Sequence, residues 1–299
     1  MTSFPFEVVR RSAPLTAFIL IIALCIHTSS VKLVCYTFML IFDRSVLDRK
    51  IKPLIRQECK YGNQTYFLSR SEAGTGWAEG IVPTQNMLAA RKIQPYASQM
   101  LKEAYKILNR TLPISSVNSN ELNVDRSKKW HFTALRFWGG KTEYGSYLPD
   151  VLSLVEDELK IPAVTTLFSI TKPGLKIIRK HHGYCNFVWR YLLSLRVSGK
   201  AYHSVYEGSK MTVTQEWNDT GQEFMFDDTF PHEGRQDATH DRVLLWFDIP
   251  RDDCPVMMNV WISFLTKTVV QHADPYVTST IRNTNRLGRE LLERLQKGE

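Results

Sequence analysis

Residues 223–251 read EFMFDDTFPHEGRQDATHDRVLLWFDIPR, and this stretch decides how the rest of the chain is interpreted. Two short apolar runs, Glu223–Phe226 and Arg242–Ile249, flank a polar segment that is rich in Asp, Thr, Gly and Pro. Runs of this length between turn-forming residues are typical of β-strands in a sandwich or barrel. The polar segment carries His232, so a residue that can bind a metal lies between two predicted strands.

Further runs of the same character precede this stretch, and they extend the predicted β region toward the N-terminus. They are Ala163–Thr171, Phe187–Arg196, Tyr202–Tyr206 and Met211–Trp217. Apolar residues at helical spacing predict helices over Ile93–Leu112, Pro149–Leu159 and Val277–Gln296. Residues 61–90 and Asn118–Lys129 are predicted to be irregular, because Gly, Pro or polar residues dominate them.

The N-terminal part contains a long apolar segment, residues 13–42, in which Lys32 is the only full charge. About 20 apolar residues suffice to cross a bilayer, so one transmembrane helix is predicted here, with Lys32 near an interface. A cleaved signal peptide and a buried core helix are the alternatives. The predicted segments are therefore a tail 1–12, an anchor 13–42, a helical and irregular linker 43–129, a β-domain 130–252 and a helical tail 253–299.

The orientation of this anchor is contested by two features of the sequence. Arg44–Lys60 holds six basic residues, against only Arg10 and Arg11 before the anchor, which favours a cytoplasmic C-terminal domain. N-x-[ST] sequons at Asn63, Asn109 and Asn218 would instead matter in a lumenal domain. The basic residues weigh slightly more, because such triplets arise often by chance.

Composition excludes several classes of protein. The 299-residue chain has a formal net charge of +8, but its Lys and Arg residues are scattered and accompany no groove-reading motif, so nucleic acid is not an expected partner. Its five cysteines show no CxxC spacing, which argues against a disulfide scaffold or a zinc ribbon. GxGxxG, Walker A and HRD motifs do not occur. The sequence leaves the oligomeric state open.

Histidines and arginines of the β region are the candidates for chemistry. His181, His182 and His232 could hold a transition metal through neutral imidazole nitrogens. Arg190 and Arg242 lie in apolar strands, where a charge is costly unless an acidic group or ligand neutralises it. An arginine can also take a ligand carboxylate in bidentate fashion. By themselves these residues also fit satisfied polar histidines and solvent-facing arginines, so the metal site stays one alternative.

Two segments in the same order and separation resemble the aspartyl/asparaginyl β-hydroxylases, a family of Fe(II)- and 2-oxoglutarate-dependent dioxygenases. The resemblance covers Trp130–Arg251. One segment holds Glu216-Trp217, Phe226-Asp-Asp-Thr-Phe-Pro-His-Glu233, Gln236-Asp-Ala238 and Arg242. The other holds Phe168-Ser-Ile170, Pro173-Gly174, His181-x-Gly183, Asn186 and Arg190-Tyr-x-Leu-x-Leu195.

The resemblance implies a mainly β fold, a double-stranded β-helix (a cupin-like jelly-roll barrel) with flanking helices. It implies that His181 and His232 bind iron, that Asp228 acts near the metal, and that Arg242 holds the distal carboxylate of 2-oxoglutarate. Ser169 and Arg190 would also contact this cosubstrate, and O2 would be the oxidant.

Departures from the family pattern qualify these roles. Gly183 stands where many iron sites have a carboxylate, which matches family members that use two histidines. Leu192 replaces a usual histidine, which removes one contact to 2-oxoglutarate. Ser194 replaces a frequent glycine, and one extra residue before His181 makes His182 an alternative ligand.

The resemblance leaves three functions open. One branch of the family hydroxylates the β-carbon of Asp or Asn in epidermal-growth-factor-like domains, and it is the preferred reading. The other resembles bacterial lipid A hydroxylases, which act on an acyl chain at a membrane. The third is a barrel that has lost turnover and serves as a binding module. The expected partners are accordingly a bilayer and a protein or lipid substrate beside it.

Overall fold

The computed structural model describes residues 84–108, 112–113, 127–181, 188–197, 199–207, 210–226, 232–250, 252, 270–273 and 275–297. The predicted anchor 13–42 lies outside this set, as do His182, Gly183 and Asp228. Within the described residues, no helix is both long and apolar enough to span a bilayer.

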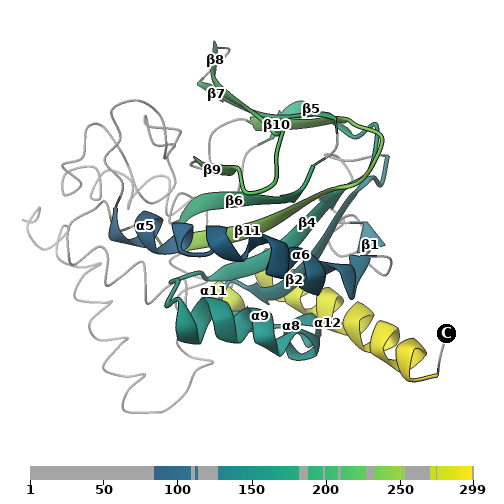
Figure 1. Ribbon diagram of the computed structural model, residues 1–299. Coiled ribbons are helices and arrows are strands. Elements are labelled where there is room, and N and C mark those ends of the chain that lie inside the picture. The colour runs from purple at the N-terminus through teal and green to yellow at the C-terminus, as the bar shows by residue number, and fades with distance from the viewer. Residues whose placement is uncertain are drawn as a thin grey trace, which may run out of the picture.

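Antiparallel strands form two sheets that lie one above the other (Figure 1). The larger sheet has the order β1-β2-β4-β11-β6-β9, with β3 paired to β2. Its strands are β1 (Leu112–Pro113), β2 (Trp130–Phe137), β3 (Gly140–Lys141), β4 (Thr165–Thr171), β6 (Val188–Arg196), β9 (Glu223–Phe226) and β11 (Arg242–Pro250). The smaller sheet has the order β5-β10-β7-β8, formed by β5 (Lys176–His181), β7 (Lys200–Glu207), β8 (Lys210–Glu216) and β10 (His232–Asp237).

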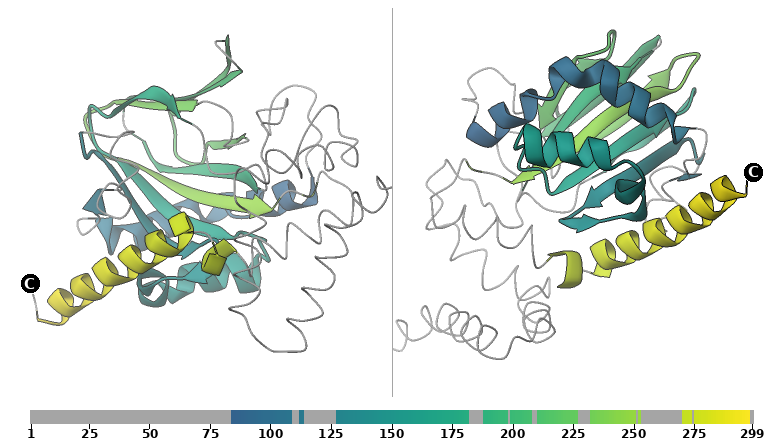
Figure 2. Two further views of the ribbon diagram at one scale, coloured as in Figure 1. Left: turned by 180° about the vertical axis from the view of Figure 1, so that it is seen from behind. Right: turned by 60° about the horizontal axis from the view of Figure 1, so that its bottom comes forward.

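Helices cover the face of the larger sheet that is turned away from the smaller sheet (Figures 1 and 2). They are α5 (Gln85–Arg91), η2 (Gln94–Tyr96), α6 (Ala97–Tyr105), α8 (Glu143–Tyr147), α9 (Pro149–Ser153) and η5 (Leu154–Glu158). α11 (Val270–Ala273) and α12 (Pro275–Gln296) follow, and α12 contacts β2 and α8. In Figure 2 the last turns of α12 extend past the sheet.

The strand β6 is apolar on both faces because each face is covered. Tyr191 and Leu193 belong to the core beneath the helices, together with Phe247 of β11. Leu192, between them, belongs to a second core that faces the smaller sheet. Side chains alternate between the two faces of a strand, so a central strand covered on both sides reads as a continuous apolar run.

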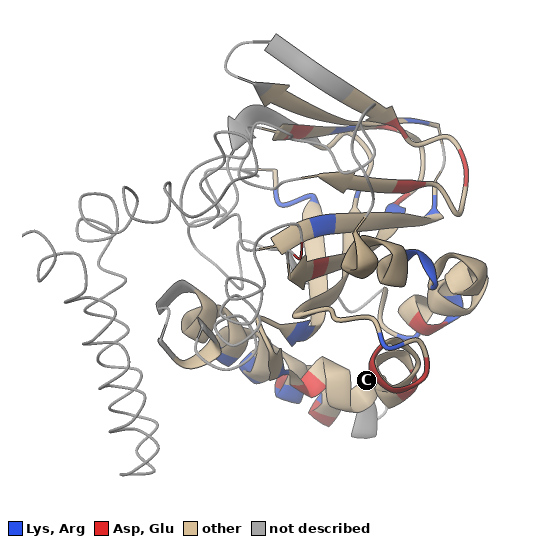
Figure 3. Ribbon diagram, turned by 90° about the vertical axis from the view of Figure 1, so that its left-hand side faces the viewer, with Lys and Arg blue, Asp and Glu red and all other residues tan. Residues whose placement is uncertain are grey.

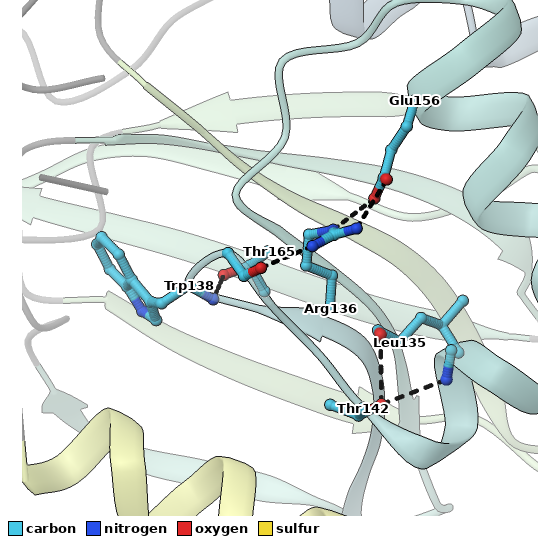
Figure 4. Close-up of polar contacts among 8 residues, drawn as sticks. Leu135, Arg136, Trp138, Thr142, Glu156 and Thr165 are labelled. Carbon is cyan, nitrogen blue, oxygen red and sulfur yellow. Dashed lines mark hydrogen bonds and ion pairs between the residues drawn. The ribbon is translucent and has the colours of Figure 1, made fainter. Parts of the chain in front are cut away.

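Arg136 of β2 ties the sheet to η5 through a two-pronged ion pair with Glu156 (Figure 4). Its Nε and Nη2 atoms donate to the two carboxylate oxygens at 2.5 and 2.8 Å. Thr142 caps α8 by accepting from the amide of Gly145, and its hydroxyl also donates to backbone carbonyls of β2. These contacts hold the α8–η5 segment against the sheet edge, away from the gap between the sheets.

The mainly β fold expected from the sequence is confirmed, and every predicted strand run coincides with a strand. Strands β2, β5 and β10 were missed, because polar residues such as those of His232–Asp237 interrupt their apolar pattern. Among the described residues the strands form two sheets rather than one closed barrel. The predicted helix Ile93–Leu112 is wrong in its bounds, since η2 with Pro95 interrupts it and α6 ends at Tyr105.

The prediction of irregular structure over 61–90 is also wrong at its end, where α5 begins at Gln85 behind the cap residue Thr84. Met87 and Ile93 are fully buried in the same core as Met100 of α6. A helix of seven residues offers too few turns for a clear apolar period, so packing on the sheet, rather than local pattern, decides this element.

Candidate functional site

A cavity lies between the two sheets, and both contribute side chains to its walls. The larger sheet supplies Trp130, Ser169, Thr171, Arg190, Leu192, Arg242, Leu244, Trp246 and, from its edge strand, Phe226. The smaller sheet supplies His203, His232 and Gly234. The volume is ≈ 40 Å³, more than the roughly 10–15 Å³ needed for one water, so the cavity is large enough to hold a water molecule.

His232 begins β10 and is buried, with an exposed fraction of 3%. Its register partner is His181, the last residue of the neighbouring strand β5. Opposite residues of an antiparallel pair share a face of the sheet. The strand register thus makes the two histidine positions direct partners, and their role as metal ligands stays a prediction. Among the described residues, no group of three or more His, Cys, Asp or Glu could hold a metal. Asp228 and Gly183 lie outside those residues.

His203 of β7 is a cavity residue that the sequence analysis missed. Its ring stacks on that of His232, with centroids 5.5 Å apart and planes 14° apart. Phe226 contacts both rings, at 4.7 Å from His203 and 5.2 Å from His232. These aromatic neighbours restrict how the His232 ring can turn. A lone histidine in an alternating strand gives no signal by which the sequence could have singled it out.

Arg242, at the start of β11, is a buried cation with an unused donor. Its exposed fraction is 4%, and its Nε atom donates to Thr171 Oγ1 at 3.1 Å. Its Nη1 atom has no acceptor among the described residues. Burial lowers the pKa of Arg242 to about 10, so the guanidinium still carries its charge at neutral pH. A carboxylate ligand would supply both the missing acceptor and the missing counter-charge.

Arg190, on β6, is held quite differently. Its Nε atom donates to Asp248 Oδ1 at 3.0 Å, and its guanidinium carbon lies 3.7 Å from the centre of the Trp246 ring. The Trp246 indole donates to the same carboxylate oxygen at 2.8 Å. Asp248 therefore supplies the counter-charge that an arginine in an apolar strand requires, and the contact of Arg190 with 2-oxoglutarate stays a prediction. Arg190 nevertheless lines the cavity.

Ser169 of β4 lines the same cavity as these arginines. Its Oγ atom accepts a hydrogen bond of 3.0 Å from the indole nitrogen of Trp130, which stacks on Trp246 at 6.5 Å. Trp130 and Thr171 are further cavity residues that the sequence analysis did not single out. For Thr171 a signal existed, because it lies two positions after Ser169 and therefore shares its face of the strand.

Leu192 and Leu244 make an apolar part of the wall, and each is 3% exposed. The register of β6 and β11 places Leu192 opposite Trp246. Position 192, where the sequence departs from the family pattern, therefore lies at the cavity and not on the surface. In contrast to this apolar wall, charged residues are spread over both strands and helices of the described chain (Figure 3).

A sequence model of the aspartyl/asparaginyl beta-hydroxylase family matches residues 96–252. The chain belongs to this family. The match begins at Tyr96, the last residue of η2, so the aspartyl/asparaginyl β-hydroxylase region extends further toward the N-terminus than the resemblance over Trp130–Arg251. It contains both sheets and every residue that lines the cavity.

Comparison with solved structures gives remote likenesses. A prolyl-4-hydroxylase of Pseudomonas putida is 15% identical with a TM-score of 0.33, and the match covers 53% of this chain and 88% of that one. A 2OG-Fe(II) oxygenase family protein of Burkholderia pseudomallei is 11% identical, with a TM-score of 0.29 and coverage of 36% and 60%. A cupin domain of Bordetella pertussis is 10% identical, with a TM-score of 0.23 and coverage of 29% and 81%. None of the curated proteins matches the chain.

The cavity residues fit the groups that the aspartyl/asparaginyl β-hydroxylase family implies. The unused Nη1 donor of buried Arg242 suits a carboxylate such as the distal one of 2-oxoglutarate. The paired register positions of His181 and His232 suit a transition metal that prefers imidazole. Of these residues, Arg242 and His232 both line the cavity between the sheets.

Proposed function

We propose that this member of the aspartyl/asparaginyl β-hydroxylase family is an Fe(II)- and 2-oxoglutarate-dependent dioxygenase that hydroxylates the β-carbon of Asp or Asn in a peptide. The observation that carries the proposal is the buried guanidinium of Arg242, which faces the cavity of His232 with no described acidic partner. Such a cation is costly in a folded protein unless a ligand neutralises it.

Each site residue expected from the sequence has a defined task in this proposal. His181 and His232 hold the iron, with His182 as the alternative first ligand, and Asp228 supports a ligand histidine or a bound water. Arg242 binds the distal carboxylate of 2-oxoglutarate, and Ser169 and Arg190 contact the same molecule. When bound, iron with 2-oxoglutarate and O2 supplies the oxidative decarboxylation and the hydroxylation of an unactivated carbon.

The apolar wall of the cavity excludes water from the reacting groups. Leu192, Leu244 and Phe226 present no hydrogen-bonding side-chain atoms, so polar contacts concentrate on Arg242 and the hydroxyls beside it. A water-poor site strengthens the attraction between a guanidinium and a carboxylate. The stacked His203 ring restricts the orientation of His232, which favours a fixed position of its ring nitrogens for a metal.

The proposal includes a membrane anchor at residues 13–42, with the catalytic domain beside the bilayer. Hydropathy supports the anchor, and the basic segment Arg44–Lys60 supports contact with anionic lipid headgroups. A glycosidase shift assay in cells tests the topology. Glycan on Asn63 or Asn109 would favour a lumenal domain and a protein substrate. No shift, together with digestion of the catalytic domain by protease added on the cytoplasmic side, would favour the acyl-chain alternative.

Turnover of 2-oxoglutarate tests the reaction. The full chain is purified in detergent, supplied with Fe(II), ascorbate, 2-oxoglutarate and an epidermal-growth-factor-like domain, and assayed for succinate and for a gain of one oxygen in the peptide. His232→Ala should abolish succinate formation and lower the iron content. His272→Ala, at an exposed position in α11, is the matched control and should leave both unchanged. Succinate formation that survives His232→Ala would overturn the metal assignment.

Substrate preference is tested in the same preparation with acylated lipid in place of the peptide. Oxygen gained by the lipid and not by the peptide would select the acyl-chain alternative. If the wild-type chain forms no succinate with either substrate although it holds iron and 2-oxoglutarate, the proposed turnover is wrong and the chain is a binding module.

A further inference from the structure

We propose that Thr171 is a further contact to the distal carboxylate of 2-oxoglutarate, and that Trp130 positions Ser169 to make the same kind of contact. The inference rests on the proposed function, because it concerns the cosubstrate pocket. It adds two residues that neither the sequence motifs nor the family resemblance single out.

Both hydroxyls are forced to act as acceptors toward the protein. Ser169 Oγ receives the indole N–H of Trp130 at 3.0 Å, and Thr171 Oγ1 receives the Nε–H of Arg242 at 3.1 Å. Indole and guanidinium groups can only donate. The protons of the two hydroxyls therefore remain available, and neither has an acceptor among the described residues.

The strand register gathers these groups at one end of the cavity. Thr171 is the Cα partner of Trp130 on β2 and of Arg242 on β11. Ser169 lies two residues earlier on β4 and also lines the cavity. Ser169 and Thr171 are 5% and 2% exposed, so water does not satisfy their hydroxyl protons freely.

Three unused donors therefore face one small space: the hydroxyls of Ser169 and Thr171 and the Nη1 of Arg242. A carboxylate offers about four acceptor positions on two oxygens and no donor, so it complements such a set. Hydrogen bonds to charged groups are the strong ones, so each donor contributes appreciably to binding.

Binding measurements on the iron-loaded full chain without oxygen test Thr171 apart from turnover. Isothermal titration with 2-oxoglutarate, and with glutarate as a dicarboxylate without the keto group, gives the Kd of each. Thr171→Val should weaken both ligands about 10-fold or more, which is the expected loss of a hydrogen bond to a charged group. Thr171→Ser, which keeps the hydroxyl, should restore binding to within about 3-fold of wild type.

A matched control removes a hydroxyl elsewhere on the same strand. Thr166 of β4 is fully buried, its hydroxyl has no partner among the described residues, and it does not line the cavity. Thr166→Val should leave both Kd values unchanged. The inference is overturned if Thr171→Val binds both ligands as wild type does. It is also overturned if a crystal structure with glutarate places Thr171 Oγ1 beyond hydrogen-bond reach of the carboxylate.

Trp130 is a positioning residue, so its test measures coupling to Ser169. Trp130→Phe keeps the aromatic ring but removes the N–H, and it should raise the Kd and the KM for 2-oxoglutarate about 3- to 10-fold with kcat unchanged. In Ser169→Ala, the additional Trp130→Phe change should have no further effect. Trp217→Phe is the control, since its buried indole nitrogen has no partner among the described residues. Independent, additive losses at Trp130 and Ser169 would overturn the positioning role.

The failures of the two proposals are distinguishable. A wild-type chain that binds neither dicarboxylate and forms no succinate overturns the proposed function and this inference together. A wild-type chain that binds 2-oxoglutarate and forms succinate, while Thr171→Val and Trp130→Phe behave as wild type, overturns the inference alone.

Discussion

Arg190 and Arg242 lie in neighbouring strands and line one cavity, yet they differ in whether the described residues supply a counter-charge. Arg190 has an acidic partner in Asp248 and lies on the ring of Trp246. Among the residues that the structure describes, Arg242 has only the neutral hydroxyl of Thr171 as a partner, and its Nη1 donor is unused. Arg190 is neutralised by the protein itself, whereas the described residues leave Arg242 without a counter-charge. A buried arginine is thus a functional candidate when its counter-charge is missing, not because it is buried.

The largest effect is expected from breaking the buried ion pair between Arg190 and Asp248, called here the framework pair. Arg190→Met leaves the carboxylate of Asp248, which is 2% exposed, without its cation. Breaking one partner of a buried ion pair costs about 3–5 kcal/mol, so the free energy of unfolding should fall by that amount in urea denaturation. Arg190→Lys, which keeps a charge but not the planar stack on Trp246, should lose less. A loss below about 1 kcal/mol in Arg190→Met would show that the pair is not structural.

The second-largest effect is expected for Arg242, the proposed binding residue for the distal carboxylate of 2-oxoglutarate. Arg242→Met should weaken 2-oxoglutarate binding by about 100-fold, because the main charged contact to the distal carboxylate is removed. The free energy of unfolding of the unliganded chain should not fall, since a buried charge without a counter-charge is replaced by an apolar side chain of similar length. Titration calorimetry and urea denaturation of the same samples measure both quantities. Destabilisation with unchanged affinity would invert the comparison.

A smaller effect tests what Trp246 adds to the framework pair. Trp246→Phe removes the hydrogen bond to Asp248 and weakens the contact with the guanidinium, while an aromatic ring remains. The free energy of unfolding should fall by about 1–2 kcal/mol. In the double variant with Arg190→Met the two losses should not add, because the residues share one network. Full additivity would mean that the two contacts act independently.

The smallest effect is expected for an arginine outside the cavity. Arg286 pairs with Glu290 on α12 at 2.8 Å, and both side chains are about half exposed (53% and 50%). Solvent screens such a pair, so Arg286→Ala should change the free energy of unfolding by no more than about 0.5 kcal/mol. Its 2-oxoglutarate affinity should equal that of wild type. A large effect here would mean that loss of any arginine, and not a specific counter-charge, explains the other variants.

The sequence predicted those site residues that lie in strongly patterned strands or in a motif of fixed spacing. His232 and Arg242 belong to such a motif, and the strand that carries Arg190 reads as a strand from its apolar run alone. His203 and Trp130 were not reached, because a single polar or aromatic residue in a strand looks the same whether it faces solvent, core or cavity. β10 was missed for a related reason, since its buried positions His232, Gly234 and Gln236 are not apolar.

The sequence by itself determined the family, most of the strands and the candidate ligand residues, because strand periodicity and motif spacing are local properties of the chain. Only the tertiary structure decided which arginine is already neutralised. Asp248 lies 58 residues from Arg190 and reaches it because the register of β6 and β11 makes them direct partners. Counter-charges across a sheet depend on strand order and register, which nonlocal packing sets, so the division of labour between the two arginines could not be read from either strand alone.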